Sequence, residues 1–254
     1  MRPPLFISHG APDVLLRDTP AHRALTGLMP SAPDAVVIVS AHWESHRVEI
    51  TSGERLETIH DFRGFDPVLN QAIYAAPGAP ALARQLAEHL TQTGVETVLN
   101  PRRGRDHGAW IPMALLRPKA DVPVIQISLP ITSDDAAIAL GEALSHFVTT
   151  LDVQIIGSGS LTHSLMDSLR EAETAPSPAF AIEFRDAILP YLETGDLEAV
   201  KAWRGLPHAQ RNHPTPEHIR PLLLAMAVAP GRPGTCLHTS WSRGALSMDI
   251  WQFG

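Results

Sequence analysis

The chain has 254 residues, of which 44% are hydrophobic, and its 20 Lys and Arg against 27 Asp and Glu give a net charge of −7. This length and composition fit one large domain with a full apolar core. Because the basic residues form no extended cluster, we expect no nucleic-acid partner. The only cysteine, Cys236, excludes an intramolecular disulfide and a thiolate-rich metal site, so any metal must be bound by histidine and carboxylate.

The chain shows neither of the two patterns that direct a protein to membranes or for export. No run approaches 18 uninterrupted apolar residues, and the N-terminus lacks the charged and apolar regions of a signal peptide. We therefore expect a cytoplasmic protein with no membrane partner.

Short β-branched runs alternate with segments of helical periodicity along the chain. Strands are expected at 4–8, 35–41, 47–51, 95–99, 122–129, 153–157, 235–240 and 246–253, and helices at 79–93, 133–150, 178–192, 195–203 and 216–229. Ser133 fits an N-cap and Gly94 fits the glycine after a helix end. The alternation predicts an α/β fold with a mainly parallel central sheet flanked by helices, in one domain over residues 1–254.

Histidines follow two of the strongest strand-like runs. His9 comes after 4–8, where Gly10 and Pro12 turn the chain, and His42 comes after 35–41, with Trp43 available to wall a crevice. Open α/β sheets bind ligands at the carboxyl ends of their strands, so the two imidazoles are expected to meet there. Each alone is more typical of a hydrogen-bonded structural residue, but together they favour metal ligation.

Two more histidines lie near the start of the expected helix 216–229. His218 would be its third residue after an N-cap at Thr215, where the positive end of the helix dipole favours the neutral imidazole that binds metals. His213 lies outside the cap and fits a loop residue bonded to backbone as well as a site residue.

Other histidines fit substrate contact or proton transfer. His163 follows the Gly-Ser-Gly-Ser run at 157–160, which matches neither a dinucleotide fingerprint nor a nucleophile elbow. His107 lies beside Asp106 and near Trp110, an arrangement that suits proton transfer next to a planar substrate. His60 opens a loop with two aromatics that could wall a substrate. The remaining histidines singled out are expected to be solvated: His22, His89, His146 and His208.

Eight short strings follow one another in order along the chain: Ser8-His9-Gly10-Ala11-Pro12, Ser40-Ala41-His42-Trp43, His60-Asp61-Phe62 with Gly64-Phe65, Tyr74-Ala-Ala-Pro77-Gly78-Ala-Pro80, Asp106-His107-Gly108-Ala-Trp110, Pro123-Val-Ile-Gln126-Ile-Ser128, Gly157-Ser-Gly-Ser-Leu-Thr-His163 and His213-Pro-Thr-Pro-Glu-His218. Together they resemble the 4,5-DOPA extradiol dioxygenase family, within the class III extradiol enzymes related to the catalytic subunit of protocatechuate 4,5-dioxygenase. Each string is weak alone, but eight over more than 200 residues form a specific signature.

The resemblance implies a role for each matching residue. His9, His42 and His218 match the family's metal ligands, and His163 matches a fourth ligand or an acid/base, with His107 as the other catalytic candidate. Trp43, His60, Arg63 and Trp110 are the candidate substrate contacts. The family's active metal is Fe(II), with Zn(II) often present in purified or crystallised members, and the implied partners are a catechol-type aromatic diol and O₂. Arg63 and Ser164 depart from the common pattern, and Arg63 fits a carboxylate contact or a solvent-facing side chain.

Two other functions use the same residues differently. The histidines could bind zinc and activate water, as in a zinc-dependent hydrolase. Alternatively, the fold could serve a non-enzymatic binding protein whose crevice takes a phosphorylated peptide or a small ligand, although a binding module has no need of a metal-poised cluster.

Overall fold

The computed structural model describes residues 2–147 and 151–254, and its centre is an eight-stranded sheet with the order β4-β3-β5-β2-β6-β1-β10-β7. A separate hairpin pairs β8 with β9. The strands are β1 (Leu5–Ser8), β2 (Ala35–Ser45), β3 (Val48–Thr51), β4 (Thr97–Asn100), β5 (Val124–Pro130), β6 (Val153–Gly159), β7 (Gly234–His238), β8 (Trp241–Ser242), β9 (Leu246–Ser247) and β10 (Ile250–Phe253).

Four adjacent strands, β5, β2, β6 and β1, are parallel and form the middle of the sheet. Strands β10 and β7 extend one edge in antiparallel fashion, and β3 joins the other side antiparallel to β5. The central strands are buried on both faces, which explains their nearly continuous apolar sequences. The predicted α/β fold with a mainly parallel sheet is confirmed.

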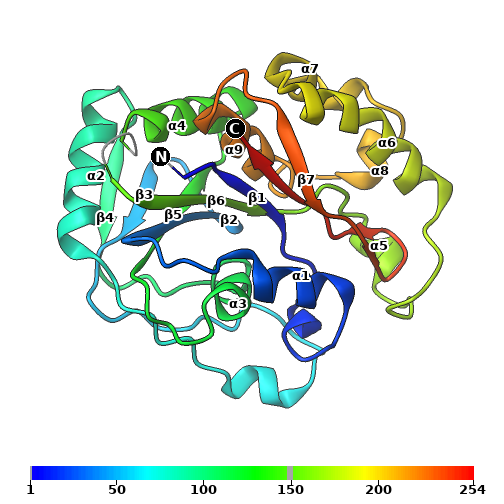
Figure 1. Cartoon of the computed structure of the whole chain (residues 1–254), viewed down its shortest axis with the longest axis horizontal. Helices are drawn as coiled ribbons and strands as arrows, with labels where there is room; N and C mark the ends of the chain where they lie inside the picture. The colour runs from blue at the N-terminus through cyan, green and yellow to red at the C-terminus, as the bar shows by residue number, and fades with distance from the viewer. Residues whose placement is uncertain (1, 148–150) are drawn as a thin grey trace.

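Helices cover both faces of this sheet (Figure 1). The helices are α1 (Pro20–Leu28), α2 (Pro80–Gln92), α3 (His107–Leu116), α4 (Asp134–Phe147), α5 (Leu165–Ser168), α6 (Ala179–Thr194), α7 (Leu197–Lys201), α8 (Ala209–Asn212) and α9 (Arg220–Val228), with 3-10 turns η1 (Pro12–Leu15), η2 (Pro67–Gln71) and η3 (Trp203–Gly205). Helices α1 and α3 pack on one face and α2, α4 and α9 on the other. Helix α6 packs with α9, β1 and β10 in a third core cluster.

Several element boundaries differ from the sequence-based expectation. The run 246–253 is two strands, β9 and β10, and the helix expected from 216 begins at Arg220. Helices α1 and α3 were not expected. The last residues of the helix expected at 133–150 lie outside the described residues, but Ser133 does accept a bond from the backbone of Ala136 as an N-cap, and Gly94 has a φ of +89° after α2.

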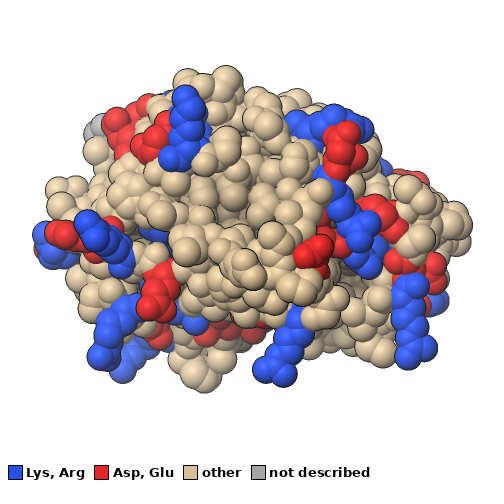
Figure 2. Space-filling view, turned by 90° about the horizontal axis from the view of Figure 1, so that it is seen from below, with Lys and Arg blue, Asp and Glu red and all other residues tan. Residues whose placement is uncertain are grey.

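Over the two described segments, no helix combines the length and apolar character that a membrane span requires. The face seen from below, in the space-filling view, intermixes acidic and basic side chains around a central area of other residues (Figure 2).

Candidate metal centre

An irregularity in the pairing of β2 with β5 places His42 at the end of the sheet where the central parallel strands terminate. Ser40 pairs with Ser128 of β5, and the next residue of β2 that pairs with β5 is Glu44. The residues between them have no pairing partner in β5. His42 lies in this irregular segment, and its backbone nitrogen donates to Ser40 Oγ at 3.1 Å. His9 follows directly after β1, and Gly10 turns the chain there with a φ of +67°.

His218 reaches the same end of the sheet from a turn that precedes α9. A Cβ at Gly159, the last residue of β6, would overlap the carbonyl oxygen of His218, so this turn packs closely on the strand because position 159 has no side chain. The expected place of His218 at the third position of a helix is wrong, because α9 begins two residues later.

The rings of His9, His42 and His218 converge. The two Nε2 atoms of His9 and His42 lie 3.0 Å apart, and the His218 ring centroid lies 5.5 Å from that of His9 and 5.0 Å from that of His42. One nitrogen from each ring lies within 4.8 Å of the others, so the set could hold a metal ion. Residues separated by more than 200 positions thus meet at one point.

The opposite nitrogen of each ring faces an oxygen atom. His9 Nδ1 lies 3.0 Å from Ser158 Oγ, His218 Nδ1 lies 2.9 Å from Glu217 Oε1, and His42 Nδ1 lies 3.9 Å from Asp61 Oδ2. Such partners fix the tautomer and the ring orientation of metal-binding histidines. The Nε2 atoms are therefore the ones directed to the common centre.

The electrostatics of the cluster favour neutral imidazoles. Burial, followed by the neighbouring histidines, lowers the pKa of His9 and of His218 well below its ordinary value. Burial and His107 lower the pKa of His42 to about 3, although Asp61 opposes the shift. Neutral imidazole is the form that ligates metals.

One atom shows that these residues fit a cation. His218 Nε2 is buried and has no hydrogen-bond partner among the described residues, which is costly for a polar atom unless a ligand engages it. A cation bound between the Nε2 atoms of His9, His42 and His218 would satisfy it. Three imidazole ligands suit zinc or iron.

His107 begins α3 beside this cluster, and Asp61 holds it. Its ring Nδ1 lies 2.9 Å from Asp61 Oδ1, and its backbone nitrogen donates to the same oxygen at 3.0 Å. Burial would raise the pKa of Asp61, but the hydrogen bonds from His107 outweigh it and lower this pKa to about 2. The ionised carboxylate leaves His107 Nε2 as the nitrogen that faces away from it. The His107 ring centroid is 3.9 Å from that of His42.

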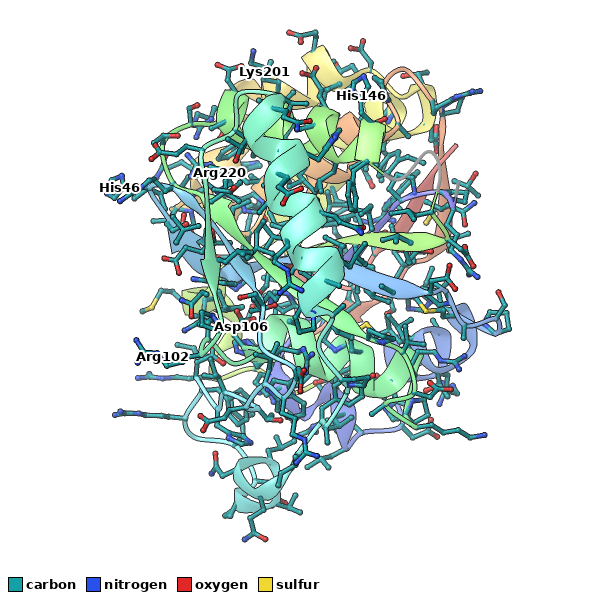
Figure 3. All side chains as sticks on the ribbon, turned by 90° about the vertical axis from the view of Figure 1, so that its left-hand side faces the viewer. His46, Arg102, Asp106, His146, Lys201 and Arg220 are labelled. Carbon is teal, nitrogen blue, oxygen red and sulfur yellow. The ribbon has the colours of Figure 1, made fainter. Side chains whose placement is uncertain are left out.

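A buried carboxylate, Asp106, joins the segments that carry these histidines. It accepts from Ser40 Oγ at 2.7 Å and from the backbone of Ala109 as the N-cap of α3, and Gln126 bonds its other oxygen. Figure 3 shows Asp106 inside the molecule, whereas Arg102 projects outward. Burial raises the pKa of Asp106 against these hydrogen bonds. The residue connects β2, β5 and α3.

His163 stacks on His218 and lies outside the set of His9, His42 and His218, but it forms with Glu217 and His218 a second group whose ligand atoms could hold a metal ion. The two rings are nearly parallel, at 10°, with centroids 3.5 Å apart. Burial lowers the pKa of His163 to about 4. His213 is buried between Phe184 and Trp203, and its Nε2 bonds the carbonyl of Leu161, so it supports the loop that carries His163.

A cavity of about 390 Å³ opens onto the histidines. Its walls include Asp61, Arg63, Glu217 and the expected His107 and His163, but Trp43, His60 and Trp110 are not among the described residues that line it. Trp110 is buried and donates from Nε1 to Ile59, and His60 bonds the carbonyl of Ala72. These two residues instead hold the loop that carries Asp61.

Of the other expectations about aromatic and histidine side chains, some are wrong and two are confirmed. Trp43 is buried under the guanidinium of Arg103, 5.0 Å from its ring centroid. His22 and His89, expected to be solvated, are half-buried and bond the carbonyls of Val14 and Ala143. His146 and His208 are exposed, as expected.

Sequence reasoning missed three residues that orient the site. Asp61, Ser158 and Glu217 all contact ring nitrogens of the cluster. Asp61 and Glu217 each stand next to a histidine in the sequence, and Ser158 lies within the Gly-Ser-Gly-Ser run. These neighbours could have identified all three as candidate site residues.

Comparisons with known proteins identify the relatives of this chain. The family model described as the catalytic LigB subunit of aromatic ring-opening dioxygenase matches residues 18–248. The 4,5-DOPA dioxygenase extradiol of Beta vulgaris is 35% identical over 98% of this chain and 95% of that protein, and the one of Escherichia coli K12 is 34% identical over 99% and 94%.

A solved structure has the same fold. An uncharacterized protein of Escherichia coli K12 superposes with a TM-score of 0.83 at 26% identity, over 100% of both chains. With relatives above 30% identity over nearly the whole chain, the family is shown: this chain belongs to the LigB family of aromatic ring-opening dioxygenases and is an extradiol dioxygenase.

Proposed function

We propose that this enzyme opens the ring of a catechol-type diol with O₂ and that His9, His42 and His218 hold Fe(II) for the reaction. The observation that carries the proposal is the convergence of three neutral imidazoles, one with an unpartnered Nε2, at the inner end of a cavity. Zn(II) would fit the same ligands in purified protein. When bound, Fe(II) would supply Lewis acidity toward the diol and electron transfer to O₂.

The chain's own residues would orient the diol and move its protons. Phe62 and Leu246 line the cavity and give apolar surface to an aromatic ring. His107 Nε2 would accept a proton from a diol hydroxyl. The ionised carboxylate of Asp61, which contacts His107 Nδ1, would stabilise the resulting positive charge on the imidazole.

His163 is proposed as the second proton carrier. It lines the cavity, and its ring lies flat on His218, outside the set of His9, His42 and His218 but within a second group, with Glu217 and His218, whose ligand atoms also converge. Its pKa of about 4 keeps it neutral at neutral pH and makes it a weak base, so it would hold a diol proton only briefly before passing it on. The dioxygenase relatives favour this reaction over the zinc hydrolase and the binding protein considered from the sequence.

Oxygen consumption tests the proposal. Protein loaded with Fe(II) under anaerobic conditions is mixed with aerobic L-DOPA, catechol or protocatechuate in an oxygen electrode, and absorbance is followed in parallel. We expect O₂ uptake with formation of a yellow ring-opened product, and neither change with Zn(II)-loaded protein. Absence of both signals with all three diols would contradict the proposal.

A further inference from the structure

A buried arginine follows the turn that carries His218. Arg220 is the first residue of α9, two positions after His218, and only 7% of its side chain is exposed (Figure 3). Its backbone nitrogen donates to the carbonyl of Pro216 at 3.1 Å, which closes the turn around His218. The position of this side chain is therefore tied to the segment of one proposed metal ligand.

The guanidinium of Arg220 reaches the end of β5 and the start of α4. Its Nε donates to Asp134 Oδ1 at 2.9 Å, and its Nη1 donates to the carbonyls of Ile131 at 3.2 Å and Pro130 at 3.5 Å. Trp203 Nε1 donates to the other oxygen of Asp134 at 3.1 Å, so the carboxylate is held in place. The planar fork of an arginine can bond acceptors in several fixed directions at once, which an ammonium group does less precisely.

The same guanidinium also meets β2, next to the segment of another proposed ligand. Arg220 Nη1 lies 3.7 Å from Glu44 Oε1, and Glu44 comes two positions after His42. Glu44 is the residue at which β2 resumes its pairing with β5 after the irregular segment that holds His42. One side chain thus links the segment of His218 to that of His42.

We infer that Arg220 is a positioning residue of the metal centre, which fixes the spacing between the His42 and His218 segments. This inference rests on the proposed function, because it takes His9, His42 and His218 as the metal ligands. Their ligand nitrogens lie within 4.8 Å of one another, and a buried network whose donors and acceptors are bonded resists displacement. Arg220 would therefore hold the imidazoles close to the spacing that an ion requires.

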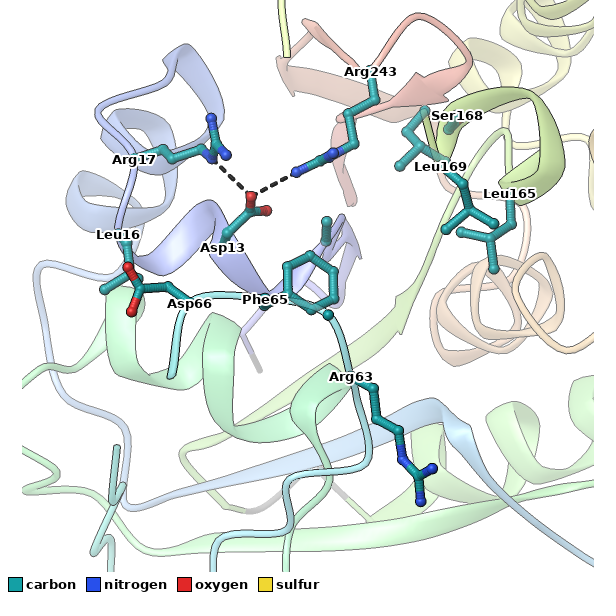
Figure 4. Close-up of a pocket in the computed structure, with 13 residues that line it drawn as sticks. Asp13, Leu16, Arg17, Arg63, Phe65, Asp66, Leu165, Ser168, Leu169 and Arg243 are labelled. Carbon is teal, nitrogen blue, oxygen red and sulfur yellow. Dashed lines mark hydrogen bonds and ion pairs between the residues drawn. The ribbon is translucent and has the colours of Figure 1, made fainter. Parts of the chain in front are cut away.

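A second cluster of the same kind provides a matched control. Asp13 accepts from Arg17 at 2.7 Å and from Arg243 at 2.6 Å, and the side chain of Arg243 is 19% exposed. Figure 4 shows these contacts at the wall of a pocket of about 490 Å³. Asp134 likewise bonds a second arginine besides Arg220. In both clusters the loss of one arginine leaves the carboxylate with another, but Arg243 is not within two positions of a proposed metal ligand.

Titration of the metal-free protein with Co(II) tests the inference, because the visible absorption of bound Co(II) depends on the number and arrangement of its ligands. In Arg220→Gln we expect an altered spectrum and a Kd raised roughly tenfold to a hundredfold, the usual effect of losing a residue that orients a metal ligand. Asp134→Asn should raise the Kd as well, and the double variant should bind no more weakly than the weaker single variant, because both changes break one contact. Arg243→Gln should keep the wild-type Kd and spectrum.

Arg220→Lys covers the case in which Arg220→Gln does not fold. The lysine keeps the charge but has no planar fork, so its Kd for Co(II) should also rise. Where Arg220→Gln folds, it is the deciding variant, and otherwise Arg220→Lys is. A wild-type Kd and spectrum in the deciding variant, or an equal change in Arg243→Gln, would overturn the inference.

The same titration separates this inference from the reaction. Arg220-dependent Co(II) binding, without O₂ uptake by the Fe(II) protein on any diol, would support the positioning role while the proposed function fails. O₂ uptake by the wild type, with Co(II) binding unchanged in the deciding variant, would overturn the positioning role alone. Absence of Co(II) binding in the wild type would overturn both.

Discussion

One carboxylate oxygen of Asp61 meets both the ring Nδ1 and the backbone nitrogen of His107, at 2.9 and 3.0 Å. The ring contact fixes which nitrogen of His107 faces the cavity, and the backbone contact fixes the start of α3. The other oxygen lies 3.9 Å from His42 Nδ1, so a single side chain orients residues with different proposed roles.

Asp61→Asn should lower kcat by roughly 10-fold to 100-fold, the usual effect of removing such an orienting partner. The amide keeps the shape of the side chain but loses the charge that would stabilise a protonated His107. Steady-state O₂ uptake measures kcat, with Asp18→Asn, an exposed carboxylate, as the control. An unchanged kcat in Asp61→Asn would contradict the role given to Asp61.

Removal of a proposed ligand should abolish metal retention. His9→Ala, His42→Ala and His218→Ala should each lose the ion during gel filtration, because two imidazoles remain in a site built from three. His107→Ala and the exposed control His46→Ala should keep it. Plasma mass spectrometry gives the metal-to-protein ratio, and full metal content in all three ligand variants would refute the assignment.

Gly108→Ala should displace the rings of His9 and His42, because a side chain at position 108 would crowd them. A Cβ there would overlap Ser40 Oγ and lie 2.9 Å from His42 Cδ2 and 3.2 Å from His9 Cε1. Overpacking of this kind costs about 1–3 kcal/mol, so we expect a lower Tm together with weaker metal binding. Gly27→Ala in α1 is the control, because its Cβ would meet no atom within 4 Å. Equal Tm and metal affinity in the two variants would argue against tight packing at position 108.

Acid should destabilise the fold partly through His213. Burial lowers its pKa to about 4, against a hydrogen bond to Leu161 that raises it. Between the ordinary pKa of 6.5 and about 4, the unfolded chain binds the proton that the folded state refuses, so the free energy of unfolding falls as pH drops through this range. The His213 share is at most about 3 kcal/mol.

Urea unfolding of metal-free protein at pH 7 and pH 5 measures this share. His213→Gln keeps an N–H donor for the Leu161 carbonyl and has no group that titrates here, so its stability should fall less between the two pH values than that of wild type. An equal fall in both proteins would show that His213 is not the titrating group.

The sequence predicts the sheet well and some helices poorly, for a physical reason. Central strands are continuous β-branched runs because both faces are buried, and that pattern is visible without structure. Helix α3 is also buried on nearly all sides and contains Pro112, so its sequence shows no amphipathic period. The N-cap at Thr19 and Pro20 do mark α1, which a search for periodicity over longer windows overlooks.

The convergence of the histidines could be predicted from the sequence, but the residues that wall the cavity could not. His9 and His42 follow strand-like runs, and parallel topology then brings them together. The directions of Trp43, His60 and Trp110 depend on the irregular segment of β2 and on loop contacts, which no local pattern encodes. Arg63 was expected as a substrate contact or a solvent-facing residue, and its exposed place on the cavity wall is compatible with both.

The wide spacing of His9, His42 and His218 also has a consequence for folding. The ion site cannot exist until β1, β2 and the turn before α9 have docked, and these segments come from opposite ends of the chain. Contacts of such long range form late. Metal binding is therefore expected to be the final step of folding. A nascent chain that lacks its last forty residues lacks His218 and should not retain the ion.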